Sequence, residues 1–287
     1  MINRSFILIC FVLQVWTNIY GQTKADSVAI ASIDWEISAP QKGIVHKRAS
    51  FPSLYKGPQY INLIEISPKA SMHFGISASD AMKETSLIAQ ERGASVAING
   101  SFYNMQKGNS VCYFRIGKEV IDTTSTDEFR MRVTGAVHTH KQKVKILPWN
   151  TDIEKKYRQR KGTLLASGPL LIMDGKTCTW EACDSSFIFT KHPRSAIFLT
   201  KDKRTVFITV DGRSPNHADG VSIPELAHLI RILGGHDALN LDGGGSTTLW
   251  MEGEGVLNSP SDNRKFDHQG ERKVSNIIYG RKNIGNQ

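Results

Sequence analysis

The sequence has 287 residues, of which 40% are hydrophobic and 22% charged, with a formal net charge of +9. This composition is that of a globular protein and excludes a mainly disordered chain, while the length allows one large domain or two small ones. The basic residues are scattered, and their densest group, KKYRQRK at 155–161, contains one aromatic residue and no repeat. We therefore expect no nucleic-acid partner. A basic surface instead favours anionic polysaccharides or phosphate groups through long-range attraction.

The N-terminus has the layout of a secretory signal. Arg4 provides the positive charge, and residues 6–16 form an apolar stretch of the usual length. We expect a signal peptide at 1–21 and a mature chain at 22–287 that is periplasmic or secreted. The apolar stretch is too short for a permanent membrane helix, and no later segment approaches about 18 consecutive apolar residues. No stable membrane insertion is expected.

The mature chain shows no linker, which predicts a single domain. Residues 22–59 lack a clear pattern, although Trp35 and Phe51 suggest a segment that docks on a core at 60–284. Runs rich in β-branched and aromatic residues predict strands at 60–66, 95–98, 143–147, 170–173, 196–200, 205–210 and 277–279. Helices are predicted at 80–91 after Ser79, and from Ile223 to Gly235 after the N-cap candidate Ser222. The predicted fold class is α+β, with a mixed, largely antiparallel sheet and a few packed helices.

Each predicted helix leads into a short apolar strand that ends in a polar turn. The first turn begins at Asn99, and the second is Asp242-Gly243-Gly244-Gly245-Ser246-Thr247. We expect the two turns to meet at the same edge of one sheet and to form the site there. The alternative is an ordinary hairpin turn, which Asn-Gly and Asp-Gly also favour; for the first turn alone the two interpretations carry equal weight.

Three consecutive glycines exceed what a tight turn needs, because each glycine adds conformational entropy that folding must overcome. Another group is therefore expected to approach this backbone closely. A run of free N–H groups, together with the hydroxyls of Ser246 and Thr247, would suit a phosphate. The lysine that follows the glycines of a nucleotide-binding P-loop is absent, which disfavours a nucleoside triphosphate.

Further polar clusters flank neighbouring strands. Arg194 precedes the strand at 196–200 and Arg213 follows the strand at 205–210, and both suit bidentate binding of a phosphate, although each could equally bridge two strands. Glycoside cleavage generally uses two carboxyl groups, for which the candidates are Asp211, Asp242 and Glu271. Of the cysteines, Cys112 fits a buried strand, and the sequence leaves open whether Cys178 and Cys183 form a disulfide.

The ordered motifs NGSFYN (99–104), SGPLL (167–171), HPRSA (192–196), VDGR (210–213), DALNLDGGGSTT (237–248), NSPSD (258–262) and GERKVSN (270–276) resemble those of the phosphodiester glycosidase family over about residues 60–280. The resemblance implies hydrolysis of the bond between an α-linked sugar, similar to N-acetylglucosamine, and a phosphodiester. It implies Asp242, Glu271 and Asp211 as catalytic candidates. The implied substrate-binding residues are Asn99, Ser101, Arg194, Arg213, Gly243, Gly244, Gly245, Ser246, Thr247 and Asn276.

Two places depart from the family pattern. Ser195 stands where threonine is usual, and the segment Asn216-His217-Ala218-Asp219-Gly220 is unlike many members, so substrate contacts there are expected to differ. One alternative function is a metal-dependent phosphodiesterase, for which no dense ligand motif is present. Another is a non-catalytic binder of cell-surface phosphopolymers, which retention of the three acidic candidates disfavours. We expect no required cofactor, with room for a single divalent cation near Asp242. The oligomeric state is not set by the sequence.

Overall fold

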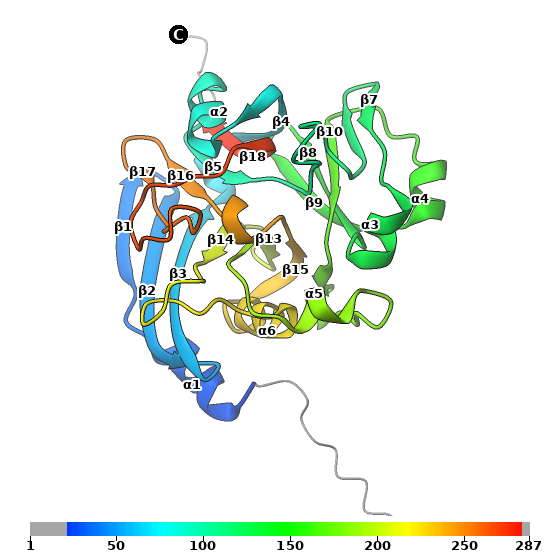
Figure 1. The fold of residues 1–287 in the computed structure, drawn as a ribbon. Helices are drawn as coiled ribbons and strands as arrows, with labels where there is room; N and C mark the ends of the chain where they lie inside the picture. Colours follow the sequence, from blue (N-terminus) through cyan, green and yellow to red (C-terminus); the bar gives the residue numbers. More distant parts are fainter. Residues whose placement is uncertain (1–21, 283–287) are drawn as a thin grey trace, which may run out of the picture.

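The computed structural model describes residues 22–282 (Figure 1). The predicted signal peptide at 1–21 lies outside these residues. The central sheet has eight strands in the order β1-β2-β3-β14-β13-β15-β11-β12. In chain order these are β1 (Glu36–Gln41), β2 (Ile44–Leu54), β3 (Gly57–Ile66), β11 (Leu170–Met173), β12 (Lys176–Thr177), β13 (Arg194–Thr200), β14 (Thr205–Val210) and β15 (Gly235–Asn240).

Two five-stranded sheets pack on the central sheet. The second sheet has the order β17-β16-β5-β18-β4 and the third sheet has the order β7-β6-β10-β8-β9. The second sheet contains β4 (Met72–Lys83), β5 (Val96–Asn99), β16 (Leu249–Met251), β17 (Gly255–Val256) and β18 (Val274–Lys282). The third sheet contains β6 (Phe114–Ile116), β7 (Glu119–Asp122), β8 (Gly135–His140), β9 (Lys143–Pro148) and β10 (Thr163–Ser167).

Residues 22–282 also contain six α-helices and two short 3-10 helices. These are α1 (Lys24–Ser32), α2 (Thr85–Glu91), α3 (Thr126–Met131), α4 (Thr151–Lys156), α5 (Ser185–Phe189), α6 (Ile223–Ile232), η1 (Pro68–Ala70) and η2 (Gly244–Ser246). The predicted α+β class is confirmed, with the strands divided among three sheets and every pairing between these strands antiparallel.

The central sheet is buried on both faces, which explains its continuous apolar strands. Phe198 and Ile208 lie in the core cluster that includes α6, whereas Ile197 and Phe207 lie in the cluster shared with the second and third sheets. Because successive side chains of a strand point to opposite faces, strands covered on both sides need apolar residues at every position. All seven predicted strands are confirmed within three residues at their ends, and those at 170–173 and 205–210 match at both ends.

Helix α6 covers one face of the central sheet. Ser222 and Glu225 form a reciprocal capping box, in which the Ser222 backbone N–H donates to the Glu225 carboxylate at 2.8 Å. Caps of this kind stabilise a helix by about 1 kcal/mol. Leu226, Leu229 and Ile230 pack into the core beneath the helix. The predicted second helix is therefore confirmed, cap included.

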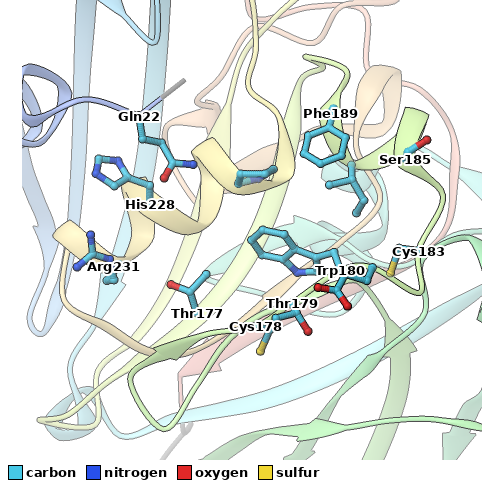
Figure 2. Close-up of a pocket in the computed structure, with 13 residues that line it drawn as sticks. Gln22, Thr177, Cys178, Thr179, Trp180, Cys183, Ser185, Phe189, His228 and Arg231 are labelled. Atoms are coloured by element: carbon cyan, nitrogen blue, oxygen red, sulfur yellow. The ribbon is translucent and has the colours of Figure 1, made fainter. Parts of the chain in front are cut away.

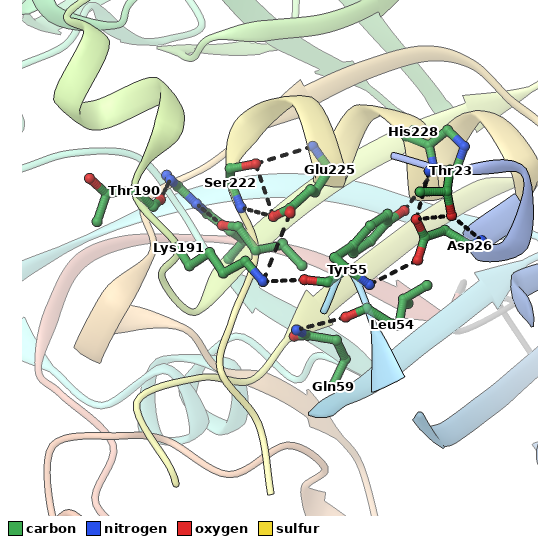
Figure 3. Close-up of polar contacts among 12 residues, drawn as sticks. Thr23, Asp26, Leu54, Tyr55, Gln59, Thr190, Lys191, Ser222, Glu225 and His228 are labelled. Carbon is green, nitrogen blue, oxygen red and sulfur yellow. Dashed lines mark hydrogen bonds and ion pairs between the residues drawn. The ribbon is translucent and has the colours of Figure 1, made fainter. Parts of the chain in front are cut away.

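The N-terminal segment docks on α6, as Figure 3 shows. The Asp26 carboxylate in α1 accepts hydrogen bonds from Thr23 and from the Tyr55 backbone N–H, and the Tyr55 hydroxyl lies 2.8 Å from Nδ1 of His228 in α6. Trp35 and Phe51 pack edge to face with ring centroids 6.2 Å apart. The segment also contributes β1, β2 and the start of β3 to the central sheet, so it forms part of the core sheet.

Two sequence-based expectations about this region of the fold are wrong. The first helix begins at Thr85, because residues 72–83 pair with β18 as strand β4, and the apolar residues Ala81 and Met82 belong to that strand. The two polar turns also follow strands of different sheets. The turn after β5 belongs to the second sheet and the turn after β15 to the central sheet, and they meet where the two sheets pack together.

The cysteine thiols that the structure describes are free. Cys112 is buried, Cys178 packs against the core shared by the three sheets, and Cys183 packs against the core around α6. No helix within residues 22–282 is both long and apolar enough to cross a membrane.

Candidate active site

The glycine turn at 242–247 connects β15 of the central sheet to β16 of the second sheet, and η2 marks it near the middle of Figure 1. Asn99, which is completely buried, holds this turn in place. Its Nδ2 donates to the Asp242 carbonyl at 2.7 Å, and its Oδ1 accepts from the Ser195 hydroxyl at 2.7 Å and from the Thr248 backbone N–H at 3.1 Å. Asn99 therefore joins the two predicted turns and orients the start of the glycine run.

The close approach that the three glycines predicted is confirmed. A Cβ added at Gly245 would lie 1.9 Å from Oδ1 of Asp262 and 2.3 Å from Nη2 of Arg272. Gly244 has a φ of +60°, and a Cβ there would lie 3.0 Å from Nη2 of Arg213. Charged side chains thus lie directly against this backbone, and no larger residue fits beneath them.

The turn does not present the expected run of free N–H groups. Gly244 donates to the Pro193 carbonyl at 2.8 Å, and Gly243 donates to the Asp242 side chain at 3.0 Å. The N–H groups of Ser246 and Thr247 donate within the turn. Within the described chain only the Gly245 N–H of this turn lacks an acceptor, so side chains must supply most donors to an anion bound here.

The Asp242 carboxyl lies half-buried at the start of the turn. Burial raises its pKa, and the positive charge of Arg132, hydrogen bonds from the Ser246 hydroxyl and the Gly243 N–H, and the charge of Arg272 act in the opposite direction. The Ser246 hydroxyl lies 3.4 Å from the hydroxyl of Tyr103. Asp242 is thus a carboxyl whose proton affinity is raised while two guanidinium groups favour its ionised form.

Arg132 was not predicted from the sequence, because it follows α3 outside any recognised motif. Its guanidinium forms two hydrogen bonds with the Glu128 carboxylate, at 2.8 and 2.9 Å, and lies 3.6 Å from the ring centroid of Phe102. The Phe187 ring in α5 lies 5.1 Å from the same guanidinium. The arginine is therefore fixed by both an ion pair and aromatic contacts beside Asp242.

Arg194 is 2% exposed and donates to backbone carbonyls of Val221, Phe187 and Thr190 at 2.9–3.0 Å. It has no carboxylate partner within 22–282. Burial and the nearby charges of Arg132 and Arg213 lower its pKa to about 9. Arg194, which was predicted to bind a phosphate, therefore anchors the loop around α5. Its charge also adds positive potential near Asp242.

Arg213 is the exposed member of the arginine group. Its backbone is left-handed, with a φ of +59°, and its guanidinium lies against Gly244 and 3.4 Å from Nδ1 of His192. Burial and the charges of Arg194 and Arg213 lower the pKa of His192, which keeps that imidazole neutral near pH 7. Arg213 forms no ion pair with any residue the structure describes. Its charge is free for an anion at the glycine turn.

Asp211 is placed beneath the glycine turn. It is 1% exposed, and its two oxygens accept from Asn258 Nδ2 at 3.0 Å and from the Ser259 backbone N–H at 2.9 Å. The same Asn258 amide group donates to the Thr247 carbonyl at 3.0 Å. Burial raises the pKa of Asp211 to about 7. Both oxygens are occupied by protein donors, so Asp211 supports the turn through Asn258.

Glu271 is placed at the start of α2. Its carboxylate accepts from the backbone N–H and the hydroxyl of Ser86, the second residue of the helix, and burial raises its pKa. Nearby, the Asn276 Oδ1 accepts from the Ser101 N–H at 2.8 Å. The Asn276 Nδ2, Ser101 Oγ and Thr247 Oγ1 atoms are buried without a partner within the described residues. Glu271 thus caps a helix, whereas Asn276, Ser101 and Thr247 lie around the glycine turn.

The structure adds three residues to the predicted set besides Arg132. Tyr103 donates its hydroxyl to the Lys273 carbonyl at 2.8 Å, and Arg272 pairs with Asp262 at 2.7 Å directly over Gly245. All three lie in motifs already identified in the sequence, at 99–104, 258–262 and 270–276. The motifs could therefore have indicated them, whereas no sequence signal indicated Arg132.

The described residues contain one group of three side chains suited to a metal ion, Asp174, His236 and Asp237. This group lies at the beginning of β15, whereas Asp242 follows the end of that strand. A cation near Asp242 would therefore need ligands other than this group.

A separate cavity of about 640 Å³ lies beside α5 and α6, and Figure 2 shows its lining. Trp180, His228 and Arg231 are among the residues that surround it, and none of the residues around the glycine turn does. Of these side chains, His228 is already hydrogen-bonded to Tyr55 and Ser27, and the Trp180 indole donates to the Leu170 carbonyl. The convergence of carboxyl and guanidinium groups at the glycine turn makes that turn the candidate active site.

A sequence model of the family described as phosphodiester glycosidase matches residues 92–280, which is more than half of the chain and includes the glycine turn. The chain belongs to the phosphodiester glycosidase family. Over 97 residues, or 34% of the chain, it is 37% identical to the uncharacterized protein YomE, derived from the SPbeta prophage of Bacillus subtilis (strain 168). The match covers 15% of that larger protein.

Solved structures of two other proteins have a similar fold. The catalytic domain of zebrafish N-acetylglucosamine-1-phosphodiester alpha-N-acetylglucosaminidase, auto-inhibited by its pro-peptide, matches with a TM-score of 0.64 and 16% identity, covering 89% of this chain and 90% of that one. A hypothetical protein from Synechocystis also matches with a TM-score of 0.64 and 16% identity, covering 87% of this chain and 64% of that one.

Proposed function

We propose that this phosphodiester glycosidase is an exported hydrolase that cleaves the bond between the anomeric carbon of an α-linked, N-acetylglucosamine-like sugar and the oxygen of a phosphodiester. The observation that carries the proposal is the position of the Asp242 carboxyl between the charges of Arg132 and Arg272, next to the unpaired guanidinium of Arg213. Export is supported by the arrangement of residues 1–21.

The arginines suit the phosphate side of this reaction. When the anomeric C–O bond breaks, its electrons pass to the phosphate oxygen, and the leaving group becomes a phosphate monoester. Arg213 can donate two hydrogen bonds to that group, while Arg132 and Arg194 contribute positive potential from fixed positions. A phosphate is already a good leaving group, so charge stabilisation contributes more than protonation of the departing oxygen.

Asp242 suits the sugar side of the reaction. In its ionised form it acts as nucleophile at the anomeric carbon or as the base that activates water. Water contributes its oxygen to the sugar, and the products are the free sugar and the phosphate monoester. Asp211 supports the turn and Glu271 caps α2, so in this proposal both act by holding the site together rather than by contacting the substrate.

The test is hydrolysis of methyl N-acetylglucosamine α-1-phosphodiester by residues 22–287 in oxygen-18 water, followed by mass spectrometry of both products. The label should appear on the sugar, and Asp242→Asn should abolish turnover while remaining folded. Asp237→Asn, near the beginning of the strand that leads to Asp242, is the matched control and should keep the activity.

Label on the phosphate would instead identify a phosphodiesterase that breaks the P–O bond, and dependence of that reaction on a divalent cation would support the metal-dependent alternative. Binding of sugar phosphodiesters without turnover would identify a non-catalytic binder.

A further inference from the structure

Two hollows adjoin each other along strand β4, the outer strand of the second sheet. One, of about 630 Å³, lies between β4 and the third sheet, and the other, of about 690 Å³, lies where β4 begins and β18 ends. Arg92, which follows α2, lines both hollows and therefore marks the place where they meet. Figure 1 shows α2, β4 and β18 together at the top of the molecule.

The charged side chains in these hollows are mostly positive. Arg92 and Lys141 line the first hollow, and Arg92, Arg281 and Lys282 line the second. All four cations are exposed, and none forms an ion pair with a carboxylate of residues 22–282. Within that part of the chain, Glu252 is the one carboxylate that lines either hollow. We call these four cations the β4 basic surface.

Folding assembles the β4 basic surface from three distant parts of the chain. Strand pairing places Arg281 opposite His73, at the beginning of β4. The Phe74 N–H donates to the Lys141 carbonyl at 2.8 Å, which holds the turn between β8 and β9 against the same strand. The Arg92 guanidinium donates to a carbonyl of β4 at 3.3 Å. Like charges held together without partners repel one another, so a bound anion would stabilise this arrangement.

The β4 basic surface is separate from the candidate active site. Asn276 lies beside the glycine turn, and Arg281 is five positions further along β18. A strand rises about 3.4 Å per residue, so these two positions are about 17 Å apart. A ligand bound at the surface would therefore leave the glycine turn free.

We propose that the β4 basic surface binds an anionic polysaccharide, whose acidic groups pair with the four cations. A polymer can follow the cations from one hollow to the other, and each hollow has the size of a small-molecule site, which suits individual sugar units. The two arginines can each bind a carboxylate through two hydrogen bonds. The inference does not rest on the proposed function, because no residue of the glycine turn takes part.

Hydroxyl-bearing residues in both hollows suit the sugar hydroxyls of such a polymer. Thr139 and Thr163 line the first hollow, and Ser95 lines the second. Oγ1 of Thr139 is buried and has no hydrogen-bond partner within residues 22–282. Hydroxyls both donate and accept hydrogen bonds, so these residues complement the neutral part of a sugar, while the cations bind its acidic group.

A nucleic acid and an anionic membrane fit these hollows less well. Proteins that bind single-stranded nucleic acids stack successive bases on several aromatic rings. The aromatic residues among the described lining are Phe74 and Tyr279, and the Tyr279 ring already lies against Gly75, where an added Cβ would be 2.5 Å from its Cζ. Anionic membranes are commonly bound by an amphipathic helix, whereas these cations line hollows beside a strand.

The test is the affinity of residues 22–287 for polygalacturonate, a polysaccharide with a carboxylate on each sugar, measured by calorimetric titration. Neutral dextran is the comparison and should not bind. The triple variant Arg92→Gln/Arg281→Gln/Lys282→Gln should raise Kd for polygalacturonate about tenfold, because each exposed charge pair contributes roughly two- to threefold to affinity. The affinity of the original protein should fall with added salt, and that of the triple variant should fall less steeply.

The matched control removes equal charge from the densest basic run of the sequence, at 155–161. The variant Lys155→Gln/Lys156→Gln/Arg160→Gln should change Kd by less than about twofold, since these residues line neither hollow. Equal losses in the two triple variants would overturn the inference, because they would mean that net charge alone attracts the polymer.

The double variant Arg281→Gln/Lys282→Gln decides the result if replacing Arg92 disturbs the end of α2. Both residues are exposed at the end of β18, and their loss should raise Kd about fivefold. An unchanged Kd, or no binding of polygalacturonate by the original protein, would overturn the inference. Tighter binding of single-stranded DNA or of phosphatidylglycerol vesicles, lost in the double variant, would also overturn it, in favour of a nucleic acid or a membrane respectively.

Discussion

The pH dependence of folding offers a direct check on the buried carboxyl beneath the glycine turn. Asp211 has a pKa of about 7 in the folded protein, raised from 3.8 because burial penalises its charged form. Between these two values the folded protein holds a proton that the unfolded chain has released. The unfolding free energy therefore falls as the pH rises through this range. A shift of about three pKa units, at roughly 1.4 kcal/mol each, corresponds to a loss of about 4 kcal/mol.

Asp211→Asn removes this dependence at the expense of one hydrogen bond. Asn258 Nδ2 and the Ser259 N–H both donate to the carboxylate, and an asparagine offers only one oxygen to the two donors. An unpaired buried donor costs about 1–3 kcal/mol at any pH. The variant should therefore be less stable than the original protein at pH 4, and as stable or more stable at pH 8.5.

Urea unfolding at the two pH values measures this crossover, provided that the slopes against urea concentration agree. Asp219→Asn, an exposed carboxyl in the same loop, controls for the removal of one negative charge. Parallel stability profiles for the original protein and Asp211→Asn would refute the reasoning, because they would mean that the folded state does not raise the pKa of this carboxyl.

Three other substitutions test the remaining parts of the site. Arg132→Gln removes a charge that favours ionised Asp242, so the acid limb of the pH profile of kcat/KM should move to higher pH. An unchanged acid limb would mean that the charge of Arg132 does not affect the ionisation of Asp242. Glu271→Gln should lower the unfolding free energy by about 1 kcal/mol through the weakened cap of α2, with less than a tenfold change in kcat, and a loss of a thousandfold would instead place Glu271 at the reacting atoms. Gly245→Ala inserts a methyl group where Asp262 lies and should therefore lower the activity. An activity retained in full would show that this close packing is dispensable.

Sequence patterns predicted the parts of the fold that local physics decides. The strands at 196–200 and 205–210 carry apolar residues on both faces, with threonine as the polar residue, because both faces of the central sheet are buried. The capping residues of α6 are adjacent in sequence, so its start could also be predicted. Residues 72–83 were missed because their strand is defined by pairing with β18, about 200 residues later in the chain, and no local pattern records that partner.

The same distinction applies to the site. The glycine run predicted close contact by another group, since the cost of three glycines can be estimated from the sequence itself. What the contacting groups are could not be predicted, because Arg272 reaches Gly245 through a loop whose path depends on the second sheet. Asp211 and Glu271 were predicted as catalytic candidates from residue type and from the family resemblance. Their hydrogen-bond partners, which assign them supporting positions, are visible only in three dimensions.

The four arginines around Asp242 differ in the partners that their guanidinium groups already have. This difference determines what each arginine can contribute to the site. Arg132 and Arg272 each bind a carboxylate, and Arg194 donates to three carbonyls, so these three guanidiniums are fixed before any ligand arrives. Their charges act at a distance and require no rearrangement when a phosphate enters, which is the condition for preorganised electrostatic stabilisation. Arg213 alone among them has no carboxylate or carbonyl partner in residues 22–282 and is exposed. In the proposed reaction it can therefore capture the phosphate, while the three fixed arginines favour the charge that would develop on breaking the anomeric bond.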